Sequence, residues 1–307
     1  MPAPVVAVLP GLPVLEDAVR SGGGRVGDAR NADAVVWTDP RDPQGLADVL
    51  KTSQARWIQL PFAGIESFFD AGVIDDTRTW TCTKGVYGPA TAEHAVALML
   101  TAARMLHRHA RRTSWWTGEE PQRMRRLDGA EVVIVGTGGI GRSAAQMLAP
   151  FGVRITAVNR SGSPMPGAAR TVVVDELAAV LGTADYVVLA AAYTPQTHHL
   201  IDAAALAQMR PSAWIINVAR GGVVDTDALV TALRAGTIAG AALDVTDPEP
   251  LPDGHPLWAM ENVLITSHTA NTRTMAIPEL CAMVARNVAH FAAGERLEGL
   301  VDPSLGY

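Results

Sequence analysis

The stretch VVIVGTGGIGR at residues 132–142 decides the fold of this protein. A run of β-forming residues leads into glycines in GxGxxG spacing, and a helix pattern follows at 139–150. In that context the first glycine makes a tight turn, the second lets backbone approach a pyrophosphate, and the third permits close helix–strand packing. The N-terminus of the following helix adds N–H groups and a positive dipole end. The stretch predicts a dinucleotide-binding loop rather than a plain glycine-rich turn. Its candidate cofactor-binding residues are Gly136, Gly138, Gly139, Ile140 and Gly141.

Strand and helix patterns alternate strongly around and after this loop. Near-continuous apolar runs predict strands at EVVIVG, RITAVN, DYVVLAA, AWIINV, IAGAALDV and NVLITS. Helix patterns lie between them at 139–150, 175–184, 202–209 and 226–235. Strands that are apolar on both faces, separated by helices, are typical of a doubly wound parallel sheet covered on both sides.

Residues 1–88 show a weaker alternation of the same kind. Short runs rich in β-formers predict strands at PVVAVLP, DAVVWT, ARWIQLP and TWTCT. They indicate a smaller parallel α/β unit. A last helix pattern at 275–293 leads into the tail GERLEGLVDPSLGY. The tail is too short to be a domain, so we expect it to return to the first unit.

A long helix pattern, PATAEHAVALMLTAARMLHRHARR, occupies residues 89–112 between the two parts. Proline suits the first helical turn, and basic residues suit the last one. His94, His107 and His109 lie on this pattern, and we interpret each as a solvated or packed side chain. The predicted domains are 1–98 with 284–307, and 99–283.

The composition restricts the class of protein. A chain of 307 residues is too long for one ordinary core and suits two domains. Hydrophobic residues make up 48% and charged residues 18%, as in globular proteins, and the net charge of −6 argues against a general nucleic-acid surface. Cys82 and Cys281 are far apart, so we expect neither a disulfide framework nor a metal site. Since there is no basic leader and no apolar run near the roughly 20 residues of a membrane span, we expect a cytoplasmic protein without a membrane partner.

The strand after the glycine loop ends in AVNRSG. Sites that prefer NAD usually carry Asp or Glu here, accepting hydrogen bonds from the ribose hydroxyls. This chain has Asn159, followed by Arg160 and Ser161. No carboxylate repels a 2′-phosphate, and a guanidinium with a hydroxyl can bind one. The alternative is an exposed arginine in a turn. We predict NADP as the preferred cofactor, with NAD possible because the Asn159 amide can bond a ribose hydroxyl.

Three polar side chains follow three different predicted strands: Arg220 after IINVA, Glu249 after ALDVTDPEP, and His268 after VLITS. Ligands of doubly wound sheets bind beyond the carboxyl ends of the strands. Arginine can bind a carboxylate with two parallel hydrogen bonds, and histidine exchanges a proton near neutral pH, with a carboxylate fixing its tautomer. A lone histidine is more often a packed or loop side chain. Next to a nicotinamide site, however, the three groups are those that reduction of a 2-oxo acid requires.

At this point the chain resembles the D-isomer-specific 2-hydroxyacid dehydrogenase family. The resemblance extends over nearly the whole chain and is carried by VGTGGIGR, MRPSAWIINVARGGVVDTDAL, GAALDVTDPEPLPDGHPLW and NVLITSHTA. It implies two Rossmann-like parallel-sheet domains: the larger binds NAD(P), and the smaller is a flavodoxin-like substrate domain. It also implies a homodimer, and the helix at 89–112 with the neighbouring TSWWTG is the expected contact surface.

The resemblance further implies a role for individual residues. Arg220 would bind the carboxylate of a small 2-oxo acid, of the glyoxylate or hydroxypyruvate type, and polarise its keto group. His268 would be the general acid in reduction, with Glu249 as its partner. The remaining expected site residues are Asp244 at the nicotinamide carboxamide, Val218 and Ala219 along the cofactor, and Ala63 and Gly64 of FAGIE at the substrate carboxylate. The alternative for the aspartate is a turn former at a strand end.

The chain departs from the family pattern at two places. Ala192-Tyr193 stands where many relatives have Pro-Leu, and TSH replaces Thr-Pro-His. Tyr193 could alter the packing of adenine or of the pocket wall. The main alternative function is that of a dinucleotide-sensing, corepressor-like binding protein without turnover. The complete set of Arg220, Glu249 and His268 argues against a sensor, since a sensor needs none of them.

Overall fold

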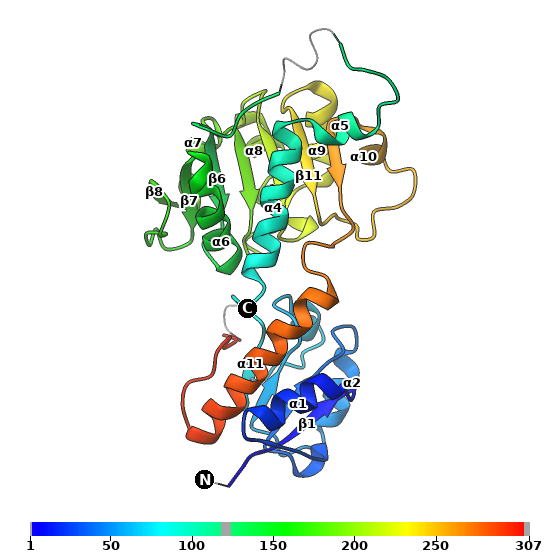
Figure 1. The fold of residues 1–307 in the computed structure, drawn as a ribbon, viewed down its shortest axis with the longest axis vertical. Helices are drawn as coiled ribbons and strands as arrows, with labels where there is room; N and C mark the ends of the chain where they lie inside the picture. The colour runs from blue at the N-terminus through cyan, green and yellow to red at the C-terminus, as the bar shows by residue number, and fades with distance from the viewer. Residues whose placement is uncertain (1, 118–123, 304–307) are drawn as a thin grey trace. The chain divides into compact units, whose positions relative to one another are not determined.

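The computed structural model of the chain describes residues 2–117 and 124–303. It divides into two compact units, one of Met1–Tyr87 with Thr272–Tyr307 and one of Gly88–Asn271 (Figure 1). These limits differ from the predicted ones, which cut through two helix patterns. In the structure each of those helices stays whole and belongs to one unit.

The packing of the two helices explains the difference. α4 (Gly88–Ala103) lies along α6 (Gly139–Leu148) from its first residue, since a Cβ on Gly88 would lie 2.6 Å from the carbonyl carbon of Gly139. α11 (Arg273–Ala293) packs on α1 (Pro13–Ser21) in the other unit. A helix whose apolar face is buried along its length moves with the surface it covers, so the limits fall in the loops before these helices.

The first unit is built on a parallel sheet with strand order β2-β1-β3-β4-β5, which is the flavodoxin-like order. Its strands are β1 (Val5–Leu9), β2 (Arg25–Val26), β3 (Ala34–Trp37), β4 (Trp57–Gln59) and β5 (Thr79–Thr81). All four runs predicted as strands are found here. β2, an edge strand of two residues, lacks an apolar run that would predict it.

Helices cover both faces of this sheet: α1, α2 (Pro43–Leu50), α3 (Glu66–Asp70) and α11. Because side chains alternate along a strand, Ala7 of β1 packs into the core with α2 and α3, while Val6 and Val8 pack with α1 and α11. The tail returns to this unit as expected, since the Val301 N–H donates to the Trp80 carbonyl at 2.9 Å.

The second unit has a parallel sheet with strand order β12-β11-β10-β9-β6-β7-β8. Its strands are β6 (Glu131–Val135), β7 (Arg154–Asn159), β8 (Arg170–Val173), β9 (Tyr186–Leu189), β10 (Trp214–Asn217), β11 (Gly240–Leu243) and β12 (Val263–Ile265). This is the order typical of dinucleotide-binding sheets, and it reverses between β6 and β9, where such sheets bind their ligands. The prediction missed β8, a half-exposed edge strand in which Val172 is the one buried residue, although the run TVVV was an available signal.

Two helical layers enclose this sheet. The helices are α4, α5 (Leu106–Ala110), α6, α7 (Leu177–Leu181), α8 (Ala203–Gln208), α9 (Thr226–Ala235) and α10 (Pro256–Ala259). Val132 and Ile134 of β6 pack with α4 and α6, and Val133 and Val135 pack with α7, α8 and α9. The doubly wound architecture predicted for both parts of the chain is confirmed.

The single helix predicted at 89–112 is wrong in one respect. Met105 adopts a left-handed conformation with φ of 52°, and this ends α4 and begins α5. The turn buries His107, whose Nε2 lies 3.1 Å from the Glu261 carbonyl oxygen and whose ring meets Trp214 edge-on. Tertiary burial thus outweighs the continuous helix pattern. Of the adjoining TSWWTG, Gly118 lies outside the described residues.

Candidate active site

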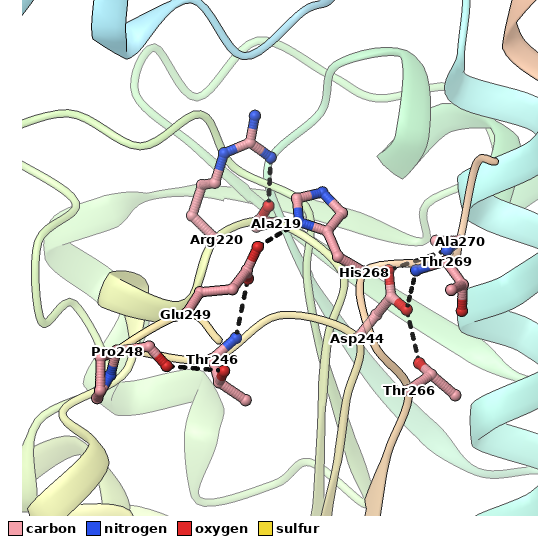
Figure 2. A network of polar contacts seen from close by, with 10 residues as sticks. All are labelled: Ala219, Arg220, Asp244, Thr246, Pro248, Glu249, Thr266, His268, Thr269 and Ala270. Carbon is pink, nitrogen blue, oxygen red and sulfur yellow. Dashed lines mark hydrogen bonds and ion pairs between the residues drawn. The ribbon is translucent and has the colours of Figure 1, made fainter. Parts of the chain in front are cut away.

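The three predicted catalytic side chains come from the carboxyl ends of neighbouring strands in the second unit. Arg220 follows β10, Glu249 follows β11, and His268 follows β12, and these strands are adjacent in the sheet. Parallel strands end at the same edge, so the three loops meet there (Figure 2).

His268 and Glu249 form a short hydrogen bond. The Nδ1 atom of His268 lies 2.6 Å from Oε1 of Glu249, and about half of each side chain is exposed. An ionised carboxylate can only accept, so Nδ1 carries a proton. The backbone N–H of Thr246 donates to the other carboxylate oxygen at 3.4 Å. The pair therefore fixes the imidazole ring and leaves Nε2 for a ligand.

The turn that carries Arg220 is built by Asn217, which is almost fully buried. Its amide nitrogen donates to the Arg220 carbonyl at 3.0 Å, and its amide oxygen accepts from the Ala219 N–H at 3.0 Å. The Arg220 side chain in turn donates from Nη1 to the Ala219 carbonyl at 2.8 Å. Asn217 was not predicted from the sequence as a site residue, although its amide near the end of the apolar run AWIINV was an available signal.

Gly221 holds this turn against the loop of Glu249. A Cβ at this position would lie 1.9 Å from the carbonyl carbon of Thr246, so any side chain would separate the two loops. Tyr193 covers the next residue, because a Cβ on Gly222 would meet its ring and hydroxyl at 2.9–3.1 Å. Tyr193 therefore packs on the turn that carries Arg220, and its expected effect on adenine or on the pocket wall stays a prediction.

Asp244, at the end of β11, is buried with several donors around its carboxylate. The donors are Thr266 Oγ1 at 2.6 Å and Thr269 N at 2.9 Å to Oδ1, and Ala270 N at 3.0 Å to Oδ2. The Nε2 atom of His94 lies 3.4 Å from Oδ1. Burial alone would raise the pKa of Asp244, but the hydrogen bonds from His94, Thr266 and the two backbone N–H groups outweigh it and lower the pKa to about 2.

These contacts give Asp244 a structural task that the sequence analysis did not foresee. The donors come from both sides of His268, and the His268 N–H itself donates to the Asp244 carbonyl at 2.8 Å. The aspartate therefore holds the loop that presents the imidazole (Figure 2). Its expected contact with a nicotinamide carboxamide stays a prediction.

The glycine loop has the shape that a bound pyrophosphate needs. Gly136 has φ of +102°, and a Cβ there would lie 2.5 Å from the Ala190 carbonyl oxygen. A Cβ on Gly141 would lie 2.0 Å from the Gly136 carbonyl oxygen, which permits no side chain. Around Gly138, in contrast, there is open space, next to the N-terminus of α6. The backbone here can approach a phosphate, so these residues fit a dinucleotide.

The turn after β7 is closed by Asn159. Its amide oxygen accepts from the N–H groups of Ser161 at 3.1 Å and Gly162 at 2.6 Å. Its amide nitrogen donates to Thr137 Oγ1 at 3.2 Å, which ties the turn to the glycine loop. Arg160 and Ser161 are exposed on this turn. The amide expected to bond a ribose hydroxyl thus already makes hydrogen bonds within the protein.

Comparison with known proteins identifies the chain. Residues 96–270 match the family described as "D-isomer specific 2-hydroxyacid dehydrogenase, NAD binding domain". The chain belongs to this family. It is therefore an oxidoreductase that acts on the CH–OH group with NAD(P) as the acceptor.

Individual relatives agree with this identification. A protein of Corynebacterium melassecola, named "Uncharacterized protein in proB 3'region", is 40% identical over 299 residues, 94% of this chain and 95% of that protein. The glyoxylate reductase of Thermofilum pendens is 36% identical over 238 residues, 72% of this chain and 67% of that enzyme. A D-isomer specific 2-hydroxyacid dehydrogenase from Xanthobacter autotrophicus Py2, crystallised with NADPH and MES, matches with a TM-score of 0.85 at 27% identity, over 99% of this chain and 100% of that one.

Two predicted substrate-binding residues of this 2-hydroxyacid dehydrogenase lie in the first unit. Ala63 and Gly64 occupy the loop between β4 and α3, after the carboxyl end of β4. Their contact with a substrate carboxylate stays a prediction. Within residues 2–117 and 124–303, no group of His, Cys, Asp and Glu side chains is arranged to hold a metal ion. In the same part of the dehydrogenase, no helix combines the length and the apolar character needed to cross a membrane.

The lowered pKa of Asp244 predicts how the free energy of unfolding of the dehydrogenase changes with pH. Since the folded-state pKa lies below the unfolded value, the carboxylate stabilises the fold fully above about pH 4, and the effect is lost as the pH falls toward 2. We expect Asp244→Asn to lower the free energy of unfolding, and the difference from wild type to shrink by roughly 2 kcal/mol over that range. Urea unfolding at a series of pH values measures it, with exposed Asp17→Asn as the control. A difference independent of pH would contradict the assignment.

Proposed function

We propose that this dehydrogenase reduces a small 2-oxo acid of the glyoxylate or hydroxypyruvate type, preferring NADPH and accepting NADH. The observation that carries the proposal is the meeting of Arg220, Glu249 and His268 at the ends of adjacent strands, with His268 and Glu249 joined at 2.6 Å. The similarity to the Thermofilum pendens glyoxylate reductase supports the substrate class.

Each side chain has one task in the proposed reaction. NADPH, when bound, supplies the hydride that adds to the carbonyl carbon of the substrate. The Arg220 guanidinium binds the substrate carboxylate and polarises the keto oxygen. Protonated His268 gives a proton from Nε2 to that oxygen as it gains charge, and Glu249 stabilises the imidazolium through Nδ1. The product is the 2-hydroxy acid, and His268 recovers its proton from solvent.

Other residues would hold the two ligands. We assign the pyrophosphate to Gly136, Gly138, Gly139, Ile140 and Gly141. Val218 and Ala219 would border the cofactor, and Asp244 would contact the nicotinamide carboxamide. Ala63 and Gly64 would add N–H groups for the substrate carboxylate, which makes the first unit the substrate domain. The homodimer and the cytoplasmic location also stay predictions.

The preference for NADPH rests on the turn after β7. Arg160 and Ser161 are exposed there, and no carboxylate stands at the position of Asn159 to repel a 2′-phosphate. The bound NADPH of the Xanthobacter autotrophicus dehydrogenase supports the same choice. Because the Asn159 amide closes the turn, its effect on specificity is to place Arg160 and Ser161.

Arg160→Ala is expected to lower kcat/KM with NADPH by about 10- to 100-fold and to leave kcat/KM with NADH nearly unchanged. A hydrogen bond to a charged group contributes roughly 1.5–3 kcal/mol, and each 1.4 kcal/mol is a factor of ten. Steady-state kinetics with both cofactors measures the ratio. Arg154→Ala, which removes an exposed arginine from the start of β7, is the matched control. If the wild type uses NADH at least as well as NADPH, the assignment of the turn is wrong.

The alternative is a protein that senses a dinucleotide without turnover. The glycine loop serves both functions, but a sensor has no use for a histidine–carboxylate pair beside an arginine. A panel of glyoxylate, hydroxypyruvate and phenylpyruvate, run with NADPH and NADH, separates the two. We expect turnover of the smaller acids with NADPH. Tight dinucleotide binding without oxidation of NADPH by any 2-oxo acid would favour the sensor.

A further inference from the structure

A histidine of α4 reaches the polar network that holds the His268 loop. The side chain of His94 is mostly buried, with 22% exposed. Its Nε2 atom lies 2.9 Å from Thr266 Oγ1 and 3.4 Å from Asp244 Oδ1. From the sequence this histidine was interpreted as a solvated or packed side chain. The structure shows it packed, and its Nε2 atom adds polar contacts to Thr266 and Asp244.

The hydrogen-bond inventory decides which atom donates. The Thr266 hydroxyl has one proton, and the 2.6 Å contact gives it to Asp244, which can only accept. Toward His94, Oγ1 therefore accepts, and Nε2 of His94 must carry the proton. The resulting chain of donors passes from His94 to Thr266 to the Asp244 carboxylate.

This chain ends at the backbone around His268. The Asp244 carboxylate accepts from the N–H groups of Thr269 and Ala270, which fixes the two residues after His268. His268 itself has φ of 52°, a left-handed conformation that side chains other than glycine rarely adopt. Such a conformation persists only where the surroundings hold it.

We propose that His94 is a positioning residue for the reduction: its Nε2–H orients Thr266 and Asp244, which keep the His268 backbone in the left-handed conformation that aims the imidazole. The proposal rests on the proposed function for its effect on turnover. Its structural half concerns only the loop after β12 and holds independently of any substrate.

The test compares two substitutions of His94. His94→Phe keeps a ring but removes the donor, and His94→Gln keeps a side-chain N–H at a similar reach. We expect His94→Phe to lower kcat for glyoxylate reduction by about tenfold, while the Kd for NADPH stays within about twofold of wild type. His94→Gln should recover kcat to within about threefold of wild type, since one hydrogen bond is restored.

His107→Phe is the matched control. His107 is also a mostly buried helix histidine with an Nε2 contact, but its partner is the Glu261 carbonyl, before the amino end of β12. Replacing His107 should lower the melting temperature and leave the kcat of the folded enzyme unchanged. Hydrogen exchange of the Thr269 and Ala270 amides gives a second readout, which should accelerate in His94→Phe and remain slow in His94→Gln and His107→Phe.

Several outcomes would overturn the proposal. They are an unchanged kcat and amide exchange in His94→Phe, equal damage in His94→Phe and His94→Gln, and an equal loss of kcat in His107→Phe. If the wild type reduces no 2-oxo acid, the proposed function fails instead. The exchange of the two amides then still decides whether His94 holds the loop.

Discussion

His268→Ala is expected to lower kcat for 2-oxo acid reduction by a factor on the order of 10² to 10⁴, with NADPH binding retained. The substitution removes the group that protonates the keto oxygen, and Glu249 is left without its partner at 2.6 Å. Single-turnover oxidation of NADPH, followed by its absorbance, measures the loss.

The control for this substitution is His290→Ala. His290 also stands beside a carboxylate, with its Nε2 3.9 Å from Glu295, but it lies on α11 in the other unit. We expect its removal to leave kcat unchanged. Near wild-type turnover in His268→Ala would show that His268 is not the general acid and is an ordinary loop histidine.

Arg220→Lys should lower kcat/KM for the 2-oxo acid by a factor on the order of 10², although the charge is kept. An ammonium cannot form two parallel hydrogen bonds to a carboxylate, and a displacement of about 1 Å in the bound substrate costs a similar factor. The substitution also removes the hydrogen bond from the guanidinium to the Ala219 carbonyl, so the turn after β10 is less well fixed. Steady-state kinetics over a range of glyoxylate concentrations separates KM from kcat.

Arg210→Lys serves as the control for the loss of a guanidinium. Arg210 pairs with Asp185, which precedes β9. It therefore lies near the amino ends of the strands, whereas Arg220 follows a carboxyl end. This variant should reduce 2-oxo acids as the wild type does. An unchanged KM in Arg220→Lys would show that another group binds the substrate carboxylate.

The sequence was sufficient for the sheets because burial leaves a local signal. Runs such as EVVIVG and DYVVLAA are apolar on both faces, and they form β6 and β9 in the middle of the sheet. β8 was missed because its apolar run is short, and as an edge strand it buries only Val172. The end of α4 was missed because the left-handed Met105 depends on burial of His107 against Trp214, a partner far away in the sequence.

The site was predictable to the same extent. Arg220, Glu249 and His268 follow strands, and a polar side chain after a buried strand is visible in the sequence. The supporting residues are different. The contact between His94 and Thr266 joins residues 172 positions apart, and Asn217 acts through hydrogen bonds to the turn after it. The fold alone brings His94 beside Thr266, so that contact required the structure, whereas Asn217 bonds residues two and three positions away and left a local signal in AWIINV.

The first unit is built from two separate segments of the chain, and the ribosome makes them at different times. One face of its sheet, with Val6, Val8 and Trp57, is covered partly by Leu280, Val284 and Val288 of α11. The ribosome makes the whole second unit before it reaches α11. Until α11 is made, part of this apolar face lacks its cover, and nascent chains can associate through the exposed part. We therefore expect slow or interrupted translation between Gly88 and Asn271 to favour aggregation of the nascent chain.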